Sequence, residues 1–153
     1  MPTYSLKRTQ LITTDLDTAW VFFNSPDNLQ AITPNTVTFK IISPQNGQPV
    51  YAGQLIEYTI RPLFGIPLYW MTEITHVAPR RYFVDEQRYG PYAFWHHQHH
   101  FREVQGGVEM TDIVNYRIGL GVLGRLANRL HVKNHLVDIF DYRYKRIEEI
   151  FKT

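Results

Sequence analysis

Hydrophobic and polar residues alternate along most of the chain from residue 54 to residue 117, with the two-residue period of β-strands. A shorter stretch of the same kind stands near the N-terminus. Segments containing Gly and Pro separate the alternating stretches, as is typical of turns between antiparallel strands. We therefore expect strands at Tyr4–Thr13, Thr36–Ser43, Gln54–Arg61, Ile66–Val77, Arg81–Arg88, Ala93–Val104 and Val108–Arg117, with Pro62 to Gly65 connecting two of them.

Two short helices are predicted after the first strand. Asp15 or Asp17 can cap the first of them. Its apolar face, which we interpret as packing surface, contains Ala19, Trp20, Phe22 and Phe23. Ser25-Pro26-Asp27 begins the second helix, and Pro34 ends it near Thr33.

After Arg117 the hydrophobic period lengthens to three or four residues, which indicates a helix. The pattern has one gap, at Lys133 and Asn134. One helix of ~30 residues accounts for the pattern, well above the usual ~11. We expect it to span Leu123 to Phe151 and to pack on the sheet through Leu126, Leu130, Val137, Phe140, Tyr144 and Ile147.

This order of elements predicts an α+β helix-grip fold, in which a curved antiparallel sheet wraps around a long C-terminal helix. No repeat or linker divides the chain, so we expect a single domain over residues 1–153. From end to end the chain resembles the SRPBCC (START-like, polyketide cyclase/dehydrase-like) superfamily, and more narrowly a group of uncharacterised bacterial members. The stretches that carry the resemblance are AWVFFNSPDNLQAITP (19–34), YTIRPLFGIPLYWMTEI (58–74), FVDEQRYGP (83–91), WHHQHHF (95–101) and TDIVNYRIGLGVLGRLA (111–127). The resemblance implies a fold more than an activity, because the superfamily includes binders, transporters and enzymes.

Composition narrows the class of partner. A formal charge of +2, without a Lys/Arg run, argues against a nucleic-acid surface. The absence of cysteine excludes disulfides, thiolate chemistry and Cys-type zinc sites. No apolar run reaches ~18 residues and the N-terminus has no signal-peptide pattern, so we expect no integral membrane association and a cytoplasmic location. Aromatic residues make up 14% of the chain, which suits the walls of a pocket.

The hairpin at Gly106-Gly107 sets the expected faces of the sheet. A two-residue type I′ turn at these glycines would place Phe101 opposite Asp112. In that register the apolar face contains Trp95, His97 and His99, together with Val114 and Tyr116. We therefore predict His97 and His99 inside and His96 and His100 outside.

The neighbouring hairpin at Gly90-Pro91 leaves two registers open. A two-residue loop would turn Glu86 inward, and a longer loop would turn Asp85 and Gln87 inward, with Asp85 opposite His97. We favour the longer loop, because proline is disfavoured at the second central position of a tight type I turn.

His97 and His99 are the main candidates for chemistry. They are ~6.6 Å apart along one strand, a spacing that allows two imidazoles to share a metal, with Asp112 as a third ligand or a supporting partner. A buried hydrogen-bond network with Asp112 and Tyr116 explains the same residues, as does contact with a ligand. A His-Asp or His-Tyr pair could also act as a general acid or base. We expect no bound metal and no cofactor, since at most three ligands are available.

These residues predict a cavity between the sheet and the N-terminal half of the long helix, because the helix loses its apolar spacing at Lys133. Trp95, His97, His99 and Tyr116 would line its polar end, and Tyr58 and Trp70 its apolar wall. Arg125 and Arg129 could meet an anionic head group at the mouth or simply be solvated. The glycines of Gly119–Gly124 could form a mobile gate or merely turn a corner.

Three functions are compatible with this pattern. The first is binding of a small hydrophobic or aromatic molecule, with Asp85, Gln87, Asp112 and the cavity residues named above as contacts. The second is a cyclase or dehydratase that uses His97 or His99 as acid or base, which the resemblance makes plausible. The third is an interaction module that docks a protein or a membrane surface. The sequence does not indicate an oligomeric state.

Overall fold

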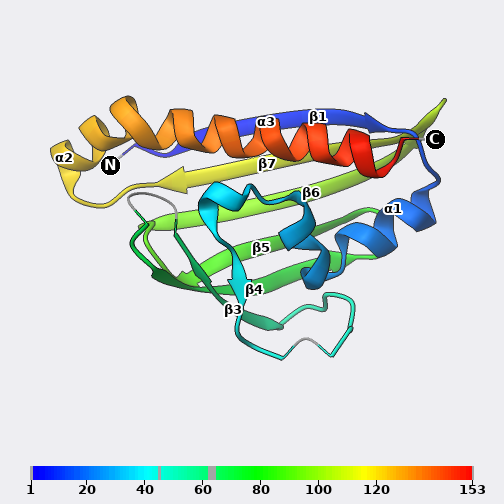
Figure 1. The fold of residues 1–153 in the computed structure, drawn as a ribbon, viewed down its shortest axis with the longest axis horizontal. Coiled ribbons are helices and arrows are strands. Elements are labelled where there is room, and N and C mark those ends of the chain that lie inside the picture. The colour runs from blue at the N-terminus through cyan, green and yellow to red at the C-terminus, as the bar shows by residue number, and fades with distance from the viewer. Residues whose placement is uncertain (1, 45, 62–64, 153) are drawn as a thin grey trace.

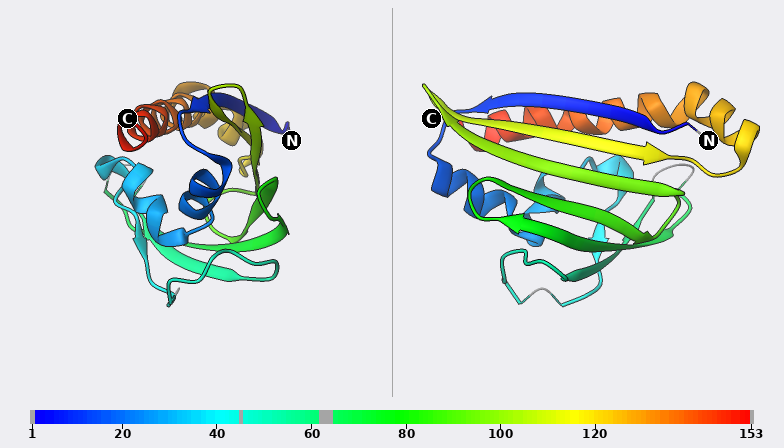
Figure 2. Two further views of the ribbon diagram at one scale, coloured as in Figure 1. Left: turned by 90° about the vertical axis from the view of Figure 1, so that its right-hand side faces the viewer. Right: turned by 180° about the vertical axis from the view of Figure 1, so that it is seen from behind.

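The computed structural model describes residues 2–44, 46–61 and 65–152, and within them seven strands form one antiparallel sheet. The strand order is β1-β7-β6-β5-β4-β3-β2. Figure 1 shows α3 running along β1, and the end-on view in Figure 2 shows the sheet curling round toward this helix. The strands are β1 (Tyr4–Ile12), β2 (Lys40–Ile41), β3 (Leu55–Ile60), β4 (Leu68–Ala78), β5 (Tyr82–Tyr89), β6 (Phe94–Val104) and β7 (Gly107–Arg117).

The predicted helix-grip architecture is confirmed, and one predicted strand is wrong. The stretch Thr36–Ser43 contains a 3-10 turn, η2 (Asn35–Val37), and only the two residues of β2. Between them Thr38 adopts φ of 42°, a left-handed conformation that interrupts an extended chain. Of the expected connection from Pro62 to Gly65, residues 62–64 lie outside the described residues.

The helix α1 (Leu16–Phe23) begins where the sequence predicts. Asp15 caps it by accepting a hydrogen bond of 2.8 Å from the backbone N–H of Thr18. Asp17, the other candidate cap, pairs with Arg80 instead. The chain continues through the 3-10 helix η1 (Pro26–Ile32), which lies against α3.

One core cluster holds α1 and the C-terminal end of α3 on the sheet. Trp20 is 8% exposed and packs edge-on against Phe83 and Phe101, with ring centroids 6.0 and 5.5 Å away. Ile147 of α3 is buried in the same cluster. Phe22 and Phe23 of α1, which the sequence predicts to be packing surface, and Phe83 of this cluster also border a cavity between the sheet and α3.

The long C-terminal helix is continuous over residues 121–150 but is not α-helical throughout. It consists of α2 (Gly121–Ala127), a π-helical segment η3 (Asn128–Val132) and α3 (Lys133–Ile150). A π segment inserts extra residues into the helical repeat, so it rotates the two halves relative to each other. The inward positions are therefore Gly124, Asn128, Leu136, Phe140, Arg143 and Ile147.

The predicted packing face was therefore right for Phe140 and Ile147 and wrong for Leu126, Leu130 and Tyr144. Leu126 and Leu130 are more than half exposed, Tyr144 is 38% exposed, and Leu123, at the expected start of the helix, is 70% exposed. Val137 is half-buried. Gly124 occupies the inward position because a Cβ there would lie 1.8 Å from the carbonyl oxygen of Gly119.

Candidate ligand-binding cavity

The β6–β7 hairpin has the predicted faces but not the predicted register. His99 lies opposite Asp112 and Trp95 opposite Tyr116, two residues away from the expected pairing. The reason is the turn, which uses Gln105 and Gly106 rather than Gly106-Gly107. Only Gly106 of these two has positive φ, which fits a type II turn rather than type I′. A shift of two residues preserves the faces, so His97 and His99 are buried as predicted, and it brings Asp112 directly beside them.

The β5–β6 hairpin has the longer loop that the sequence favoured. Asp85 lies opposite His97 and Glu86 opposite His96. The side chain of Gln87 closes the loop, since its amide donates to Tyr92 O at 2.7 Å and accepts from Tyr92 N at 3.1 Å. Gln87 therefore satisfies backbone groups and is absent from the cavity wall.

Two carboxylates and two imidazoles form a closed network on the inner face. Asp112 Oδ1 lies 2.8 Å from His97 Nε2 and 3.1 Å from His99 Nδ1. Asp85 Oδ2 lies 2.7 Å from His99 Nε2 and 3.5 Å from His97 Nδ1. Each histidine thus faces both carboxylates, one contributed by β5 and the other by β7.

This geometry assigns the protons. Nε2 and Nδ1 of His99 lie 2.7 and 3.1 Å from a carboxylate oxygen, so an imidazolium at this position satisfies both contacts, whereas Nδ1 of His97 lies 3.5 Å from its nearest carboxylate oxygen. Burial alone would lower the pKa of His99, but its bonds to Asp112 and Asp85 outweigh burial and raise it. Burial and the neighbouring charge of His99 lower the pKa of His97, so this ring is neutral and donates from Nε2 to Asp112.

The carboxylates respond in the opposite direction. Burial would raise the pKa of Asp112, but hydrogen bonds from the two histidines hold it below its ordinary value. Burial likewise opposes ionisation of Asp85, and the histidines overcome it, so the pKa of Asp85 is also lowered. Both acids are therefore anions, and a single imidazolium balances one of them.

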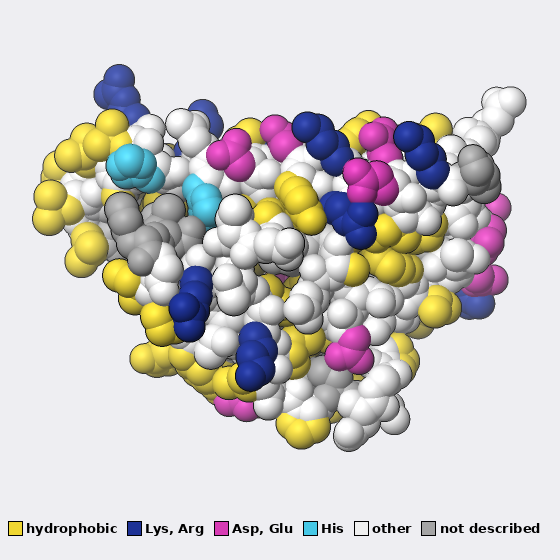
Figure 3. All heavy atoms as spheres, in the orientation of Figure 1, with side chains coloured by type: hydrophobic (Ala, Val, Ile, Leu, Met, Phe, Trp, Pro, Cys, Tyr) yellow, Lys and Arg dark blue, Asp and Glu magenta, His cyan; other side chains and the backbone are white. Residues whose placement is uncertain are grey.

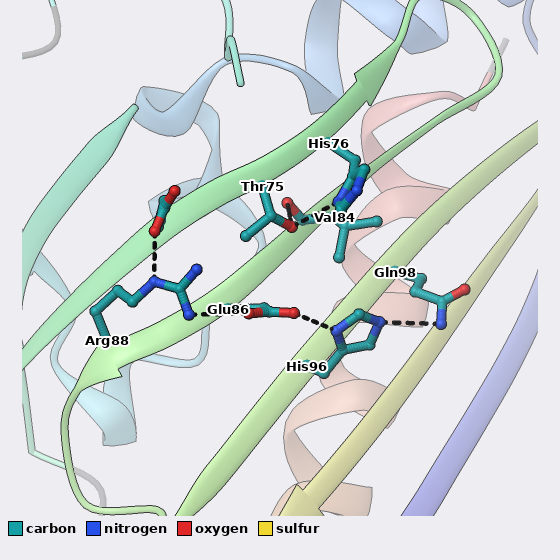
Figure 4. Close-up of polar contacts among 8 residues, drawn as sticks. Thr75, His76, Val84, Glu86, Arg88, His96 and Gln98 are labelled. Carbon is teal, nitrogen blue, oxygen red and sulfur yellow. Dashed lines mark hydrogen bonds and ion pairs between the residues drawn. The ribbon is translucent and has the colours of Figure 1, made fainter. Parts of the chain in front are cut away.

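The other two histidines of the string lie on the outer face, as predicted. His96 Nδ1 contacts Glu86 Oε1 at 2.8 Å, and Gln98 bridges His96 and His100. Figure 4 shows His96 between Glu86 and Gln98 on the side of the sheet turned away from α3. Arg88 extends this outer chain through Glu86. The alternation of β6 thus divides HHQHH into a buried pair and a surface pair.

A cavity of about 180 Å³ lies between the inner face of the sheet, η1 and α3. Figure 3 shows the surface hollowed near the centre of the view, beneath α3. The residues of α3 that reach the cavity are Ile139 and Arg143, from the C-terminal half of the long helix. The prediction of a cavity beside the N-terminal half was wrong, because Lys133 and Asn134 face solvent and the inward face continues through Leu136.

Most of the lining is apolar. Its polar part includes Asp85, His97, His99, Thr72 and Arg143. The apolar part includes Leu29, Ile32, Phe39, Ile56, Ile60, Phe83, Met110 and Ile139, with the aromatic rings of Tyr58, Trp70 and Trp95. The cavity therefore has an apolar body and one charged wall.

Tyr58 and Trp70 form one aromatic wall and share one polar partner. Their rings stack with centroids 5.8 Å apart. Trp70 Nε1 donates to Thr72 Oγ1 at 3.0 Å, and the hydroxyl of Tyr58 lies 3.0 Å from the same oxygen. Burial, reinforced by the charge of Asp85, raises the pKa of Tyr58, so this phenol stays protonated.

Of the nine residues that the sequence proposed as ligand contacts, six line the cavity. These are Trp95, His97, His99, Asp85, Tyr58 and Trp70. Asp112 lies behind the histidines and supports them, and Gln87 closes a loop. Tyr116 is 2% exposed and points toward the other half of the helix, where its hydroxyl donates to Asn128 Oδ1 at 2.9 Å.

The cavity contains one cation that the sequence argument missed. Arg143 of α3 is 8% exposed and lines the cavity, whereas Arg125 and Arg129, the arginines considered for a head group, are exposed and lie outside it. The available signal was the helical spacing of Arg143 from Leu136, Phe140 and Ile147, which places it on the same inward face.

Asp85, His97 and His99 could in principle hold a metal ion. Their ligand atoms all lie within 4.8 Å of one another. A zinc ion needs unprotonated nitrogens at about 2.0–2.1 Å, and His99 can supply one only by losing the proton that it shares with Asp85 and Asp112. The arrangement of Asp85, His97 and His99 therefore fits a hydrogen-bonded network better than it fits a metal-binding site.

The glycine-rich corner before the long helix is held by packing. Gly124 lies against the carbonyl group of Gly119, with no room for a Cβ between them, and Leu120 turns the chain with φ of 66°. These contacts indicate that the segment Gly119–Gly124 turns a corner before the helix and does not act as a mobile gate.

Comparison with known proteins shows the fold alone. No family model matches the chain, and a search of curated proteins finds no match. Among solved structures it is similar to protein CV1439 from Chromobacterium violaceum, with a TM-score of 0.74, 8% identity and 97% of each chain covered. It is similar to TTHA0849 from Thermus thermophilus, with a TM-score of 0.72, 13% identity, and 97% of this chain and 95% of that one covered. It is also similar to ginseng major latex-like protein 151 from Panax ginseng, with a TM-score of 0.69, 14% identity and 99% of each chain covered. The chain therefore has a helix-grip fold.

Proposed function

We propose that this protein binds a small, largely apolar or aromatic molecule in the cavity between the sheet and α3. The observation that carries the proposal is the cavity of about 180 Å³, which has a mostly apolar wall and a few polar groups on one side. Ligand sites in proteins combine these two features, because the apolar wall supplies affinity and the polar groups fix orientation.

The wall favours an organic ligand over water. Water needs two to four polar partners, and the polar groups of this cavity lie on one side, so its apolar part is better filled by an organic group. The aromatic part of this wall, formed by Tyr58, Trp70 and Trp95, offers flat surfaces for an aromatic ring. The charged wall beyond it suits a ligand with one polar end.

The test is stabilisation by a neutral aromatic probe, 2-naphthamide. A ligand that binds only the folded state raises the melting temperature in proportion to the logarithm of its concentration. We expect Trp95→Ala to reduce this shift. Phe94→Ala, its neighbour on the outer face of β6, is the matched control and should keep it. Equal shifts in both variants, or none in the parent protein, would contradict binding in this cavity.

A second candidate function is acid–base catalysis on a bound carbonyl compound or enol. The observation that favours it is His97, a buried imidazole with a lowered pKa that lines the cavity and donates to Asp112. A neutral imidazole oriented by a carboxylate is a competent general base. Incubation with aromatic ketones in deuterium oxide would test this, since a general base exchanges the hydrogens next to the carbonyl for deuterium, which mass spectrometry detects. An acid–base enzyme should lose this exchange with His97→Gln while keeping binding.

We further propose that the 153 residues act as a single START-like domain of the SRPBCC kind, cytoplasmic and without a nucleic-acid partner. The resemblance of the whole chain and its formal charge of +2 support this.

A further inference from the structure

Arg143 is a buried cation without a bonded counterion. Its Nε atom is buried and has no hydrogen-bond partner in the described part of the chain. Its guanidinium carbon lies 4.9 Å from the centroid of the Phe140 ring, so the group is stacked on one side and faces the cavity on another. Buried polar groups without partners are rare and costly, and a buried guanidinium more so.

The nearby carboxylates form no hydrogen bond or ion pair with this arginine, although Asp85 lies close enough to interact with its charge. Asp85, the acid in the same wall, is bonded to His99 at 2.7 Å and lies near His97. Asp112 is occupied by both histidines. No carboxylate of the described residues lies within the 4 Å of an ion pair with Arg143. The planar fork of donors therefore remains available to whatever fills the cavity.

We propose, on the basis of the proposed function, that the ligand of this cavity is an apolar acid whose carboxylate is bound by Arg143. A guanidinium can bind a carboxylate through two parallel N–H···O bonds, and burial strengthens such a pair. The positive charge of His99 balances the negative charge of one of the two aspartates. A ligand carboxylate therefore meets a wall with less negative charge than two free aspartates would give.

A matched pair of probes tests this. 2-Naphthoate and 2-naphthamide share one bicyclic body and differ in the charge of one substituent. By isothermal titration calorimetry at pH 7 we expect the parent protein to bind the naphthoate about ten to a hundred times more tightly, the usual effect of a charged hydrogen bond.

Arg143→Met keeps the apolar stem and removes the charge, so it should abolish the preference while retaining affinity for 2-naphthamide. Arg129→Met, an exposed arginine of the same long helix, should leave both affinities unchanged. Binding of 2-naphthamide by Arg143→Met also shows that this variant is folded, since only a folded cavity can bind the amide. Failure of 2-naphthamide to bind the parent protein would refute the proposed function itself. Binding of 2-naphthamide with no preference for the naphthoate, or a preference that survives Arg143→Met, would overturn this inference alone.

A second inference rests on the corner that begins the long helix, independently of the cavity. Leu120 is 80% exposed, and large apolar side chains follow it around the outer surface of α2 and η3. Figure 3 shows hydrophobic side chains gathered over α2, at the left edge of the view. We define this apolar tip by Leu120, Val122, Leu123, Leu126 and Leu130. Apolar patches of this kind are typical of interaction sites.

The charges around the apolar tip favour one partner. Arg125, Arg129 and Lys133 are exposed among these residues, and the sequence has no carboxylate between Asp112 and Asp138. An apolar surface interleaved with cations matches the interface of an anionic membrane. A second copy would instead bring like charges together. No helix in the described ranges is long and apolar enough to cross a membrane, so the contact would be at the surface.

We infer that the apolar tip docks onto anionic lipid surfaces. The protein should co-sediment with vesicles containing phosphatidylglycerol, bind several-fold less to pure phosphatidylcholine, and be released by salt. Leu123→Ser with Leu126→Ser should lose binding, whereas Leu11→Ser with Val21→Ser, exposed elsewhere, should keep it. The inference would be overturned if the protein did not bind these vesicles. It would also be overturned if the protein self-associated in the analytical ultracentrifuge and the substitutions in the apolar tip abolished that association.

Discussion

The imidazole rings of His97 and His99 lie with their centroids 3.8 Å apart on the inner face of β6. Two imidazolium ions at that distance would repel strongly in a buried site. The two carboxylates that face them can retain one proton on the pair, and the geometry assigns it to His99. The cavity wall thus contains a charged and a neutral histidine side by side.

The first prediction concerns these protons. The raised pKa of His99 contributes stability that is present below its unfolded pKa of about 6.5 and is lost as pH rises through the folded value. The lowered pKa of His97 acts oppositely, and stability falls as pH drops from about 6.5 toward its folded value. Together they predict a maximum of the histidine contribution near pH 6.5.

A pH titration followed by nitrogen-15 NMR of the imidazoles should show His99 losing its proton at a higher pH than His97. Loss of the proton from His99 at the same pH as His97, or at a lower one, would show that the carboxylates do not hold the proton.

The second prediction concerns Asp112. Asp112→Asn leaves His99 with one charged partner in place of two, and removal of one member of a buried ion pair typically costs about 3–5 kcal/mol. Denaturation in urea should therefore show a large loss in the free energy of unfolding. Glu109→Gln, a change on the same strand as Asp112, removes the partner of exposed Arg102 on β6 and should cost at most about 1 kcal/mol. Similar losses in the two variants would mean that the buried network contributes little.

The third prediction tests the rotation of the long helix. Leu136 is 4% exposed and Leu130 is 55% exposed. Leu136→Ala should cost about 2–5 kcal/mol of unfolding free energy, and Leu130→Ala no more than about 0.5 kcal/mol. A larger loss for Leu130→Ala than for Leu136→Ala would contradict the observed rotation and support the continuous α-helix that the sequence predicts.

The fourth prediction concerns metal. We expect zinc to raise the melting temperature by no more than a degree or two at neutral pH, because it must displace the proton network of His99. Calorimetry with untagged protein is the measurement. Near-stoichiometric zinc binding that His97→Ala abolishes would contradict it.

Much of the fold could be predicted because its signals are local. Two-residue alternation located six of the seven strands, and the inward pair of histidines follows from the same alternation. The β6–β7 register was wrong by two residues, since nothing in the Gly106-Gly107 pair determines which residue precedes the turn. The error did not change the inward face because a shift of two keeps side chains on the same side.

The misplaced cavity and the missed arginine share one cause. The π-helical segment at Asn128–Val132 rotates the helix, and no sequence pattern distinguishes such a segment from continuous α-helix. The three- and four-residue helical spacing, counted toward the N-terminus from Ile147 through Arg143 and Phe140, gives the observed inward face. The same spacing, counted toward the C-terminus from Leu123, gives residues that are exposed.

The three tryptophan side chains offer the most direct test of a ligand-binding cavity. Trp70 and Trp95 line it, whereas Trp20 lies in the core beside Phe83 and Phe101. In nitrogen-15 correlation spectra titrated with 2-naphthamide, the indole signals of Trp70 and Trp95 should shift saturably and that of Trp20 should stay nearly fixed. Unchanged indole signals at saturating probe, or shifts confined to the backbone of Leu120 to Leu130, would contradict binding between the sheet and α3.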